Sequence, residues 1–371
     1  MFHNYKFRNL NVKLIMAVIA LTIIGIFVIG SANEANQQKQ ILGMILGIIV
    51  MAVMALIDYD FLLHFHWVYY GMVIVLLASV LLFGSTSGGA KRWIEVGIRF
   101  QPSELAKILL ILFFAWFFMM YEEDINKPKI LAITAVLSMV PLILIEEEPD
   151  LSTTIVTMMI ICVMIFVTGV SYKLVGIVLG VAIPAISILL ILVMQEGQTI
   201  LDEYQGLRIL AWLKPEKYPE SSYQQQNSIM AIGSGQLMGK GLGNEAFDSV
   251  KNGNYISEPH TDFIFAVAGE ELGFLGSVAI IGLLFIITFE ILLIAKRAKD
   301  TSGKLICVGM AALIGFQSFV NICVVTGLMP NTGLPLPFVS YGLTSLVTVY
   351  FGIGIVLNVS LQSKSINGRL F

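Results

Sequence analysis

Long apolar runs dominate the pattern of hydrophobic and polar positions along this chain, and short polar segments separate them. Each long run has about the ~20 residues that an α-helix needs to cross the hydrocarbon core of a bilayer. We predict ten spans, at 14–30, 41–57, 67–83, 103–121, 130–146, 151–169, 174–194, 274–295, 305–327 and 339–360. The apolar stretch 263–272 is too short to cross alone, so we expect it either to extend the eighth span or to lie at the interface.

The composition supports the same fold class. The 371 residues are 57% hydrophobic and 13% charged, whereas a soluble protein of this size carries about 25% charged residues. We therefore predict an all-α polytopic membrane protein with about ten transmembrane helices, built as a single domain over residues 1–371. The net charge of −3 excludes the basic surface that nucleic acid requires. The three cysteines lie in apolar runs and have no metal-site or disulfide spacing.

Lysine and arginine residues in the short connections predict the orientation of the bundle, because cytoplasmic loops are enriched in basic residues. Ten spans put both termini on one side of the membrane, and that side holds 12 of the 22 basic residues. We therefore expect cytoplasmic termini. Two connections on the opposite side are unusual: 84–102, and the large extracellular loop 195–262 between spans seven and eight. Loops as long as the second are often functional.

A group of cations lies in the first of these outer segments. Lys91, Arg92 and Arg99 fall there against the positive-inside trend, and Lys107 follows just inside the next span. Such cations either snorkel to the interface and pair with acids, or bind the phosphates of a lipid-linked anion. Glu104 and Lys107 are three residues apart and can pair on one helical face, yet ionisable residues inside a membrane are also default candidates for function.

Four carboxylates precede the sixth span in the stretch IEEEPDLSTT, residues 145–154. Asp150 can cap the helix that follows, but capping does not account for Glu146, Glu147 and Glu148. A site for a hard cation and a pair of acids tuned by mutual repulsion both stay open for them.

The stretch EPHTDFIFAVAGEEL, residues 258–272, places Asp262 where the large loop meets the membrane. One reading is that Thr261 or Asp262 caps the helix that follows. The functional reading is a carboxylate whose pKa is raised by a partly apolar environment, which suits a general base toward an alcohol nucleophile. The cations, the acids and the large loop all fall on one side of the membrane. Together they indicate chemistry or binding on a lipid-linked anionic substrate.

A glycine-rich stretch, AIGSGQLMGKGLG, occupies residues 231–243 of the large loop. It does not match a P-loop, so nucleotide binding is not expected. Its backbone amides remain candidates for holding an anion or a sugar.

Six motifs occur in one order along the chain: GGAKRWI (88–94), FQPSELAK (100–107), EPDLS (148–152), AIGSG (231–235), EPHTDFIFAVAGEELGFLG (258–276) and TGLPLPFVSYG (332–342). With them the chain resembles the SEDS family (shape, elongation, division and sporulation), the peptidoglycan polymerases of the RodA, FtsW and SpoVE type. The resemblance implies a ten-span fold and an inverting glycosyltransferase. Its donor is the growing glycan strand on undecaprenyl diphosphate, and its acceptor is the 4-hydroxyl of lipid II.

The resemblance also implies roles for particular residues. The essential aspartate of the family falls on Asp262, which is expected to act as the base. The residues expected to bind substrate or diphosphate are Lys91, Arg92, Trp93, Glu104, Lys107, Glu148 and Asp150.

The resemblance further implies a class B penicillin-binding protein as the transpeptidase partner and an outward-facing site in the bacterial plasma membrane. It leaves Mg²⁺ or Mn²⁺ open as a cofactor. The short termini favour a RodA-like role in elongation and rod shape, while a division or sporulation role stays open. The alternative from a different class is a flippase that moves lipid II across the membrane.

Overall fold

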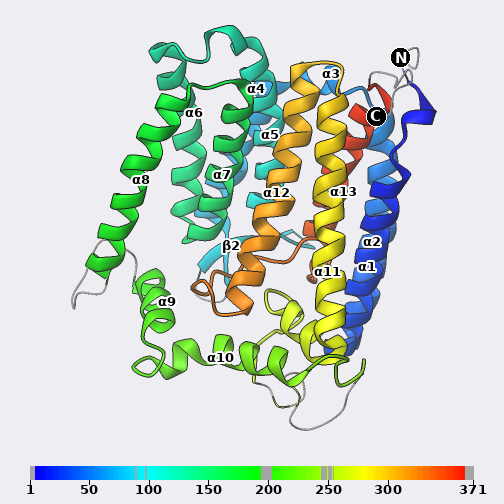
Figure 1. The fold of residues 1–371 in the computed structure, drawn as a ribbon, viewed down its shortest axis with the longest axis vertical. Coiled ribbons are helices and arrows are strands. Elements are labelled where there is room, and N and C mark those ends of the chain that lie inside the picture. The colour runs from blue at the N-terminus through cyan, green and yellow to red at the C-terminus, as the bar shows by residue number, and fades with distance from the viewer. Residues whose placement is uncertain are drawn as a thin grey trace.

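The computed structural model describes residues 5–87, 90–96, 98–193, 203–243 and 255–363, together with Ser249 and Gly253. Gly88 and Gly89 of the motif GGAKRWI, and parts of the loop 195–262, lie outside these residues. Helices dominate the fold and run mostly side by side (Figure 1), which confirms the prediction of an all-α polytopic membrane protein. The two described ends of the chain meet, because the Lys6 N–H donates to Leu361 O at 3.0 Å.

Nine helices in the described part of the chain are long and apolar enough to cross a membrane. They are α1 (Val12–Ala32), α2 (Glu34–Leu56), α4 (His66–Phe83), α5 (Pro102–Met120), α6 (Pro128–Glu146), α7 (Leu151–Thr168), α11 (Ile264–Arg297), α12 (Thr301–Val325) and α13 (Leu343–Leu361). The predicted seventh span, 174–194, coincides with α8 (Tyr172–Val193). Each predicted span therefore overlaps a helix.

Side-chain caps and prolines define many of the helix ends. Asn11 accepts a hydrogen bond from the Leu14 N–H at 3.0 Å and caps α1. Pro102 and Pro128 stand in the first turns of α5 and α6, where the missing amide proton costs nothing because that N–H has no partner within the helix.

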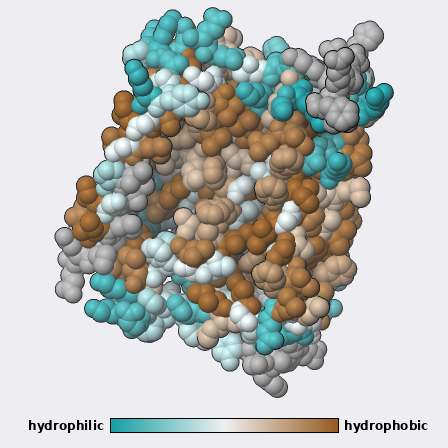
Figure 2. Space-filling model, viewed as in Figure 1, coloured by the Kyte–Doolittle hydropathy of each residue, from teal (hydrophilic) through white to brown (hydrophobic). Residues whose placement is uncertain are grey.

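The core of the bundle consists of α5, α12 and α13, which are the most deeply buried spans. Around them, α13 packs against α2, α11 against α12, and α4 against α5. Outward-facing residues such as Trp67, Val75 and Phe83 on α4 are apolar and exposed, as expected for a surface in contact with lipid rather than water. A broad hydrophobic belt between two more polar ends is visible in Figure 2.

The outer segment 84–102 contains a small antiparallel sheet that the hydrophobic pattern did not predict. Its strands are β1 (Ser85–Ser87), β2 (Ala90–Val96) and β3 (Ile98–Phe100), in the order β1-β2-β3. The large loop contains two helices, α9 (Glu203–Leu213) and α10 (Pro219–Ser234). Figure 1 shows these elements together at the end of the bundle opposite the termini.

The helix α11 begins earlier than the predicted eighth span and bends at Gly273. This glycine has φ +67° and ψ −162°, so two helical segments meet there at a kink. The first segment, Ile264–Leu272, is almost entirely buried. The apolar stretch 263–272 is thus a separate helical segment that extends the span with a change of direction.

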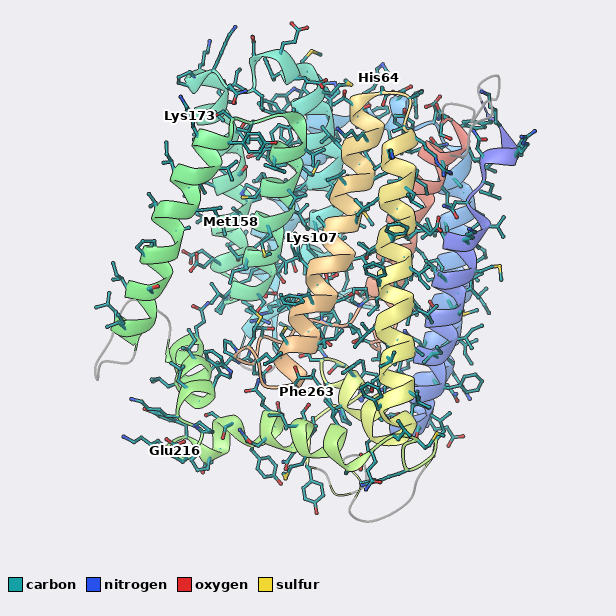
Figure 3. The ribbon with its side chains drawn as sticks, in the orientation of Figure 1. His64, Lys107, Met158, Lys173, Glu216 and Phe263 are labelled. Carbon is teal, nitrogen blue, oxygen red and sulfur yellow. The ribbon has the colours of Figure 1, made fainter. Side chains whose placement is uncertain are left out.

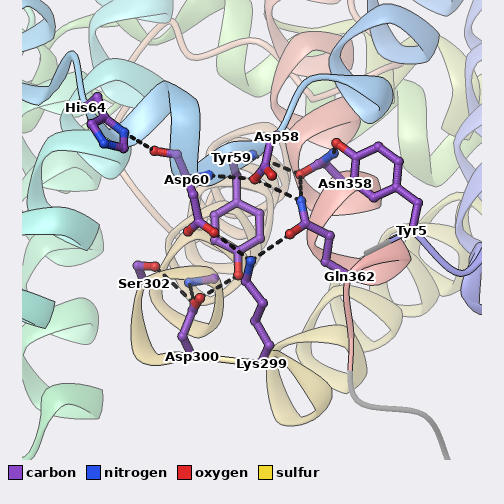
Figure 4. Close-up of polar contacts among 11 residues, drawn as sticks. Tyr5, Asp58, Tyr59, Asp60, His64, Lys299, Asp300, Ser302, Asn358 and Gln362 are labelled. Atoms are coloured by element: carbon purple, nitrogen blue, oxygen red, sulfur yellow. Dashed lines mark hydrogen bonds and ion pairs between the residues drawn. The ribbon is translucent and has the colours of Figure 1, made fainter. Parts of the chain in front are cut away.

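A hydrogen-bonded network joins short segments at the terminal end of the bundle (Figure 4). It includes the first residues of α3 (Tyr59–Leu63) and connects them to the start of α12 and the end of α13. Lys299 Nζ donates to Asp60 Oδ2 at 2.6 Å and to Gln362 Oε1 at 2.7 Å. The buried Tyr59 hydroxyl donates to Asp300 Oδ2 at 2.7 Å. We call Tyr59, Asp60, Lys299, Asp300 and Gln362 the terminal-end network. The remaining short elements at this end are η1 (Phe7–Asn9) and η2 (Glu122–Asp124).

Candidate active site

Four segments that are far apart in the sequence meet around Asp262. Asp262 precedes α11, Arg92 comes from β2, Arg208 from α9 and Gly333 from the loop before α13. A Cβ built on Gly333 would lie 3.2 Å from Asp262 Oδ2. The same point is 3.6 Å from Arg92 Nη1 and 3.8 Å from Arg208 Nη1. Both guanidinium groups therefore approach one carboxylate beside a residue without a side chain. We call these four residues the Asp262 cluster.

Hydrogen bonds to the backbone hold Asp262 in place. Asn321 Nδ2 on α12 donates to Asp262 O at 2.7 Å and to Leu334 O at 2.6 Å. Ser340 Oγ donates to Thr261 O at 2.7 Å. The segment before α11 and the loop before α13 are therefore fixed to the same helix, and the carboxylate has a defined position relative to Gly333.

The environment of Asp262 changes its acidity. Burial raises the pKa of this half-buried carboxyl to about 6, although the positive charges of Arg208 and then Arg92 act in the opposite direction. An aspartate with this pKa is mostly ionised at neutral pH and is a stronger base than an exposed one. The capping alternative is wrong, because Phe263 occupies the N-cap position of α11 and no side chain caps that helix.

Strand β2 separates the cations that the sequence places together, because successive side chains of a strand point to opposite faces. Arg92 faces the loop between α6 and α7: its Nε lies 3.7 Å from Asp150 Oδ2. Its guanidinium also donates to the carbonyl oxygens of Glu148 and Pro149. Arg92 therefore links the Asp262 cluster to this acidic loop.

The neighbours of Arg92 have other partners. Lys91 Nζ donates to Leu81 O, near the end of α4, at 2.6 Å. The Arg99 guanidinium lies 4.5 Å from the centre of the Trp93 ring. Of the cations predicted to act together in this segment, Arg92 joins the Asp262 cluster, whereas Lys91 is directed to α4 and Arg99 to Trp93.

The four acids of 146–150 differ in their exposure. Glu146 and Glu147 are exposed, and Glu148 and Asp150 are buried. Asp150 Oδ1 accepts a hydrogen bond from the Thr153 N–H at 3.1 Å, so the predicted cap of α7 is confirmed. The acidic stretch thus divides into a solvated pair and a buried pair.

Glu148 is fully buried, and neither carboxyl oxygen has a hydrogen-bond partner among the described residues. Burial raises the pKa of Glu148 to about 9; the negative charge of Asp150 adds to the rise and Arg92 opposes it. Glu148 therefore carries a proton at neutral pH. Repulsion from Asp150 thus contributes to the raised pKa of Glu148, but burial contributes more.

Glu104 and Lys107 form the pair that their spacing predicts. Lys107 Nζ donates to Glu104 Oε1 at 2.8 Å and to Gln317 Oε1 at 2.7 Å. Gln317 Nε2 in turn donates to Pro335 O at 3.0 Å. Lys107 is buried within the bundle, as Figure 3 shows. The pair therefore supports the loop that carries Gly333.

The glycine-rich stretch packs against the kink of α11 instead of opening to a ligand. The N–H groups of Lys240 and Gly241 donate to the carbonyl oxygens of Glu270 and Glu271 at 2.9 and 3.0 Å. The Gly243 N–H donates to Ser31 Oγ at 3.0 Å. The prediction that amides of this stretch hold an anion or sugar is wrong for these three, because protein oxygens already accept their hydrogen bonds.

Arg208 is a member of the cluster that sequence reasoning missed. It lies on α9 four residues before Trp212, so both side chains share one face of the helix. Arg208 Nη1 donates to Asn331 O at 3.3 Å, and Trp212 Nε1 donates to Gly327 O at 2.9 Å. The signal that could have identified Arg208 is its spacing from Trp212, which puts a cation and an indole on one face of a short helix in the large outer loop.

The resemblance leaves Mg²⁺ or Mn²⁺ open, so the carboxylates near Asp262 are the candidate metal ligands. In the described part of the chain, no group of three or more His, Cys, Asp or Glu residues is placed to hold a metal ion. Asp150 pairs with Arg92, and Asp262 faces two arginines. These residues do not fit a metal site formed by protein ligands alone, so no step of the mechanism below involves a metal.

Comparisons with known proteins identify the family and the fold. The family model FTSW_RODA_SPOVE, described as cell cycle protein, matches residues 7–365. The chain is 34% identical over 366 residues to peptidoglycan glycosyltransferase MrdB of Escherichia coli (strain K12), covering 97% of this chain and 95% of that one. It is 35% identical over 380 residues to the probable peptidoglycan glycosyltransferase FtsW of Geobacter sulfurreducens (strain DL-1 / KN400), covering 95% of each.

Two solved structures resemble the whole fold. A chain from a study of polymerization and crosslinking by a peptidoglycan synthase complex superposes with a TM-score of 0.77 at 29% identity, covering 96% of this chain and 98% of that one. The rod shape determining protein RodA of Thermus thermophilus superposes with a TM-score of 0.67 at 27% identity, covering 97% of each chain. The chain therefore belongs to the FtsW, RodA and SpoVE family of membrane proteins.

Proposed function

We propose that this protein is a peptidoglycan glycosyltransferase in which Asp262 is the general base. The observation that carries the proposal is the Asp262 cluster: a half-buried carboxylate with a raised pKa, approached by two arginines. The names of the relatives give the reaction class. The cluster provides the two components that the reaction needs, a base for a hydroxyl and positive charge for a diphosphate.

The reaction is a displacement at the anomeric carbon of the donor strand. The 4-hydroxyl of lipid II attacks that carbon, and the bond to the undecaprenyl diphosphate oxygen breaks. The hydroxyl proton passes to Asp262, and the α-linked diphosphate leaves with inversion to a β-1,4 bond. A positioned base contributes about 10²–10⁴-fold to such a step.

The charged neighbours have different parts in this proposal. Arg92 and Arg208 stabilise the negative charge of the leaving diphosphate, because preorganised cations in a partly dry site act strongly on developing charge. The Glu104–Lys107 pair acts through Gln317 on the loop of Gly333. Glu148 is buried and protonated. It can donate a hydrogen bond to a substrate oxygen if the side chains that cover it move when the substrate binds.

The orientation follows from charge. The predicted spans put both termini on the side of the membrane that holds 12 of the 22 basic residues, which supports cytoplasmic termini. The Asp262 cluster, at the other end, then faces outward, where lipid II is available for polymerisation. A class B penicillin-binding protein is the proposed partner, in line with the similarity to a chain from a peptidoglycan synthase complex.

The test is polymerisation of labelled lipid II by the purified protein, with and without its class B partner. We expect glycan strands of many disaccharides. Vesicles loaded with the same preparation report whether labelled lipid II crosses the membrane. Movement across the membrane without any strand formation would support the flippase and contradict the transferase. A parallel sample with EDTA decides whether Mg²⁺ or Mn²⁺ is required together with the substrate phosphates.

A further inference from the structure

A second concave site lies at the terminal end of the bundle, where α1 begins and α11 ends. A cavity of about 350 Å³ opens there. Its charged lining consists of Arg8 from η1, Lys13 from α1, and Glu290 and Arg297 from α11. Three elements therefore direct basic residues into one cavity that takes no part in the chemistry at Asp262.

The three basic side chains of this cavity have no acidic partner among the residues that the structure describes. Among the described residues, Arg8, Lys13 and Arg297 make no side-chain hydrogen bond or ion pair. Two other lysines at this end do have acidic partners: Lys127 Nζ lies 2.7 Å from Asp124 Oδ1, and Lys299 Nζ lies 2.6 Å from Asp60 Oδ2. The three cavity cations therefore keep their charge available for an anion.

Glu290, the acid among the described lining residues, is held at the wall of the cavity. Asn11 Nδ2 donates to Glu290 Oε2 at 2.8 Å, while Asn11 Oδ1 accepts from the Leu14 N–H and caps α1. The cavity is lined on this side by Val12 and Lys13, the first two residues of α1. A helix start adds partial positive charge to that of the three cations.

Apolar surface continues directly from the cavity. Leu10, Val12 and Leu293 belong to its lining. Phe7, which precedes Arg8 in the chain, and Met16, about one helical turn after Lys13, are each 66% exposed. A ligand that fits this surface has a negatively charged phosphate and an attached hydrocarbon chain. Membranes offer such a ligand at this depth, and basic clusters beside spanning helices attract anionic lipids.

We propose that this cavity binds the phosphate of an anionic phospholipid in the leaflet at the terminal end. Arg8, Lys13 and Arg297 hold the phosphate, and the acyl chains lie along the exposed apolar side chains of η1 and α1.

Lipid binding to the purified, delipidated protein tests the proposal. Native mass spectrometry counts the phosphatidylglycerol molecules that stay bound to wild type and to the triple variant Arg8→Gln/Lys13→Gln/Arg297→Gln. Loss of three charges is expected to weaken retention about tenfold or more. The matched control Lys129→Gln/Lys173→Gln/Lys304→Gln removes the same charge from exposed positions outside the cavity, and it should retain the lipid as wild type does.

A second variant tests whether misfolding explains the loss of lipid by the triple variant. Glu290→Gln removes a negative charge from the cavity and keeps the shape, so it should retain more phosphatidylglycerol than wild type. The proposal is overturned if the triple variant and its control lose the lipid equally, or if phosphatidylcholine is retained as well as phosphatidylglycerol. Equal binding of inorganic phosphate alone would show that the cavity takes a free anion and not a lipid.

Discussion

Carboxylates at the two ends of the bundle differ in their hydrogen-bond partners. At the terminal end, Asp60 and Asp300 accept short hydrogen bonds from Lys299 and Tyr59. At the other end, Asp262 faces two arginines at a point where Gly333 leaves space, and Glu148 has no hydrogen-bond partner among the described residues. The first arrangement satisfies its polar groups and holds the segments together.

The second arrangement leaves Glu148 buried without a hydrogen-bond partner among the described residues. Burial of that kind lowers stability unless something compensates, and it is typical of sites where a substrate supplies the missing contacts. Charge alone therefore does not mark the site in this chain. Exposure and the number of partners distinguish the acids that act from the acids that hold the fold together.

The largest effect is expected from Asp262→Asn, because the amide cannot accept the hydroxyl proton. Polymerisation of lipid II should fall at least about 100-fold, while the thermal unfolding midpoint in detergent changes little. The matched control is Asp60→Asn at the terminal end, which should polymerise at nearly the wild-type rate per folded molecule. Equal activity of wild type and Asp262→Asn would remove Asp262 as the base.

A smaller loss is expected from Arg92→Gln. The change removes a charge beside Asp262 and the hydrogen bonds to the loop of Glu148 and Pro149. Hydrogen bonds to charged groups are worth about 1.5–3 kcal/mol, so kcat/KM for lipid II should fall roughly 10- to 100-fold. Arg99→Gln is the control, since Arg99 is exposed and stacks on Trp93. A loss with Arg99→Gln as large as that with Arg92→Gln would contradict the separation of the two faces of β2.

The pH dependence of kcat/KM should follow the ionisation of Asp262. Because the base must be ionised, kcat/KM is lost as the pH falls through the pKa of about 6. Arg208 lowers that pKa, so Arg208→Gln should move the acidic limb of the profile upward by about one pH unit. The measurement is the rate of strand synthesis between pH 5 and 8. An unchanged limb would mean that Arg208 does not act on the base.

The smallest effect is expected from Glu148→Gln. Glu148 already carries a proton at neutral pH because its pKa is raised to about 9, and glutamine keeps both the size and a hydrogen-bond donor. Polymerisation should change by less than about threefold at pH 7. A loss as large as that with Asp262→Asn would show that Glu148 is ionised when it acts, and the contrast between the two carboxyl groups would fail.

Much of the fold could be predicted because membrane helices have a strong local signal. Ten apolar runs indicated ten helices, while the early start and the kink of α11 needed the structure. Strand β2 gave no such signal: its polar sequence reads as a loop until it pairs with its neighbours. The separation of Arg92 from Lys91 and Trp93 therefore could not be predicted.

Site residues could be predicted only where a single segment of the sequence contains them. Asp262 and the Glu104–Lys107 pair belong to local motifs, and sequence spacing identified them. Arg208 and Gly333 join Asp262 through tertiary contacts between distant segments, which no spacing reports. The burial that distinguishes Glu148 from Glu147 is likewise a property of packing, although the two residues are neighbours in the chain.

The packing of α13 against α2 has a consequence for biosynthesis. Gly47 on α2 lies against Tyr350 on α13, where a Cβ would come within 2.9 Å of the tyrosine ring, so the two helices are matched to each other and not to lipid. About 300 residues separate them in order of synthesis, and chains are made from the N-terminus onward. The face of α2 around Gly47 therefore lacks its partner helix until α13 is inserted into the membrane. Gly333, in the loop before α13, takes its position beside Asp262 only at that stage. A ribosome that stops before that point releases a chain with most of its spans and an incomplete Asp262 cluster.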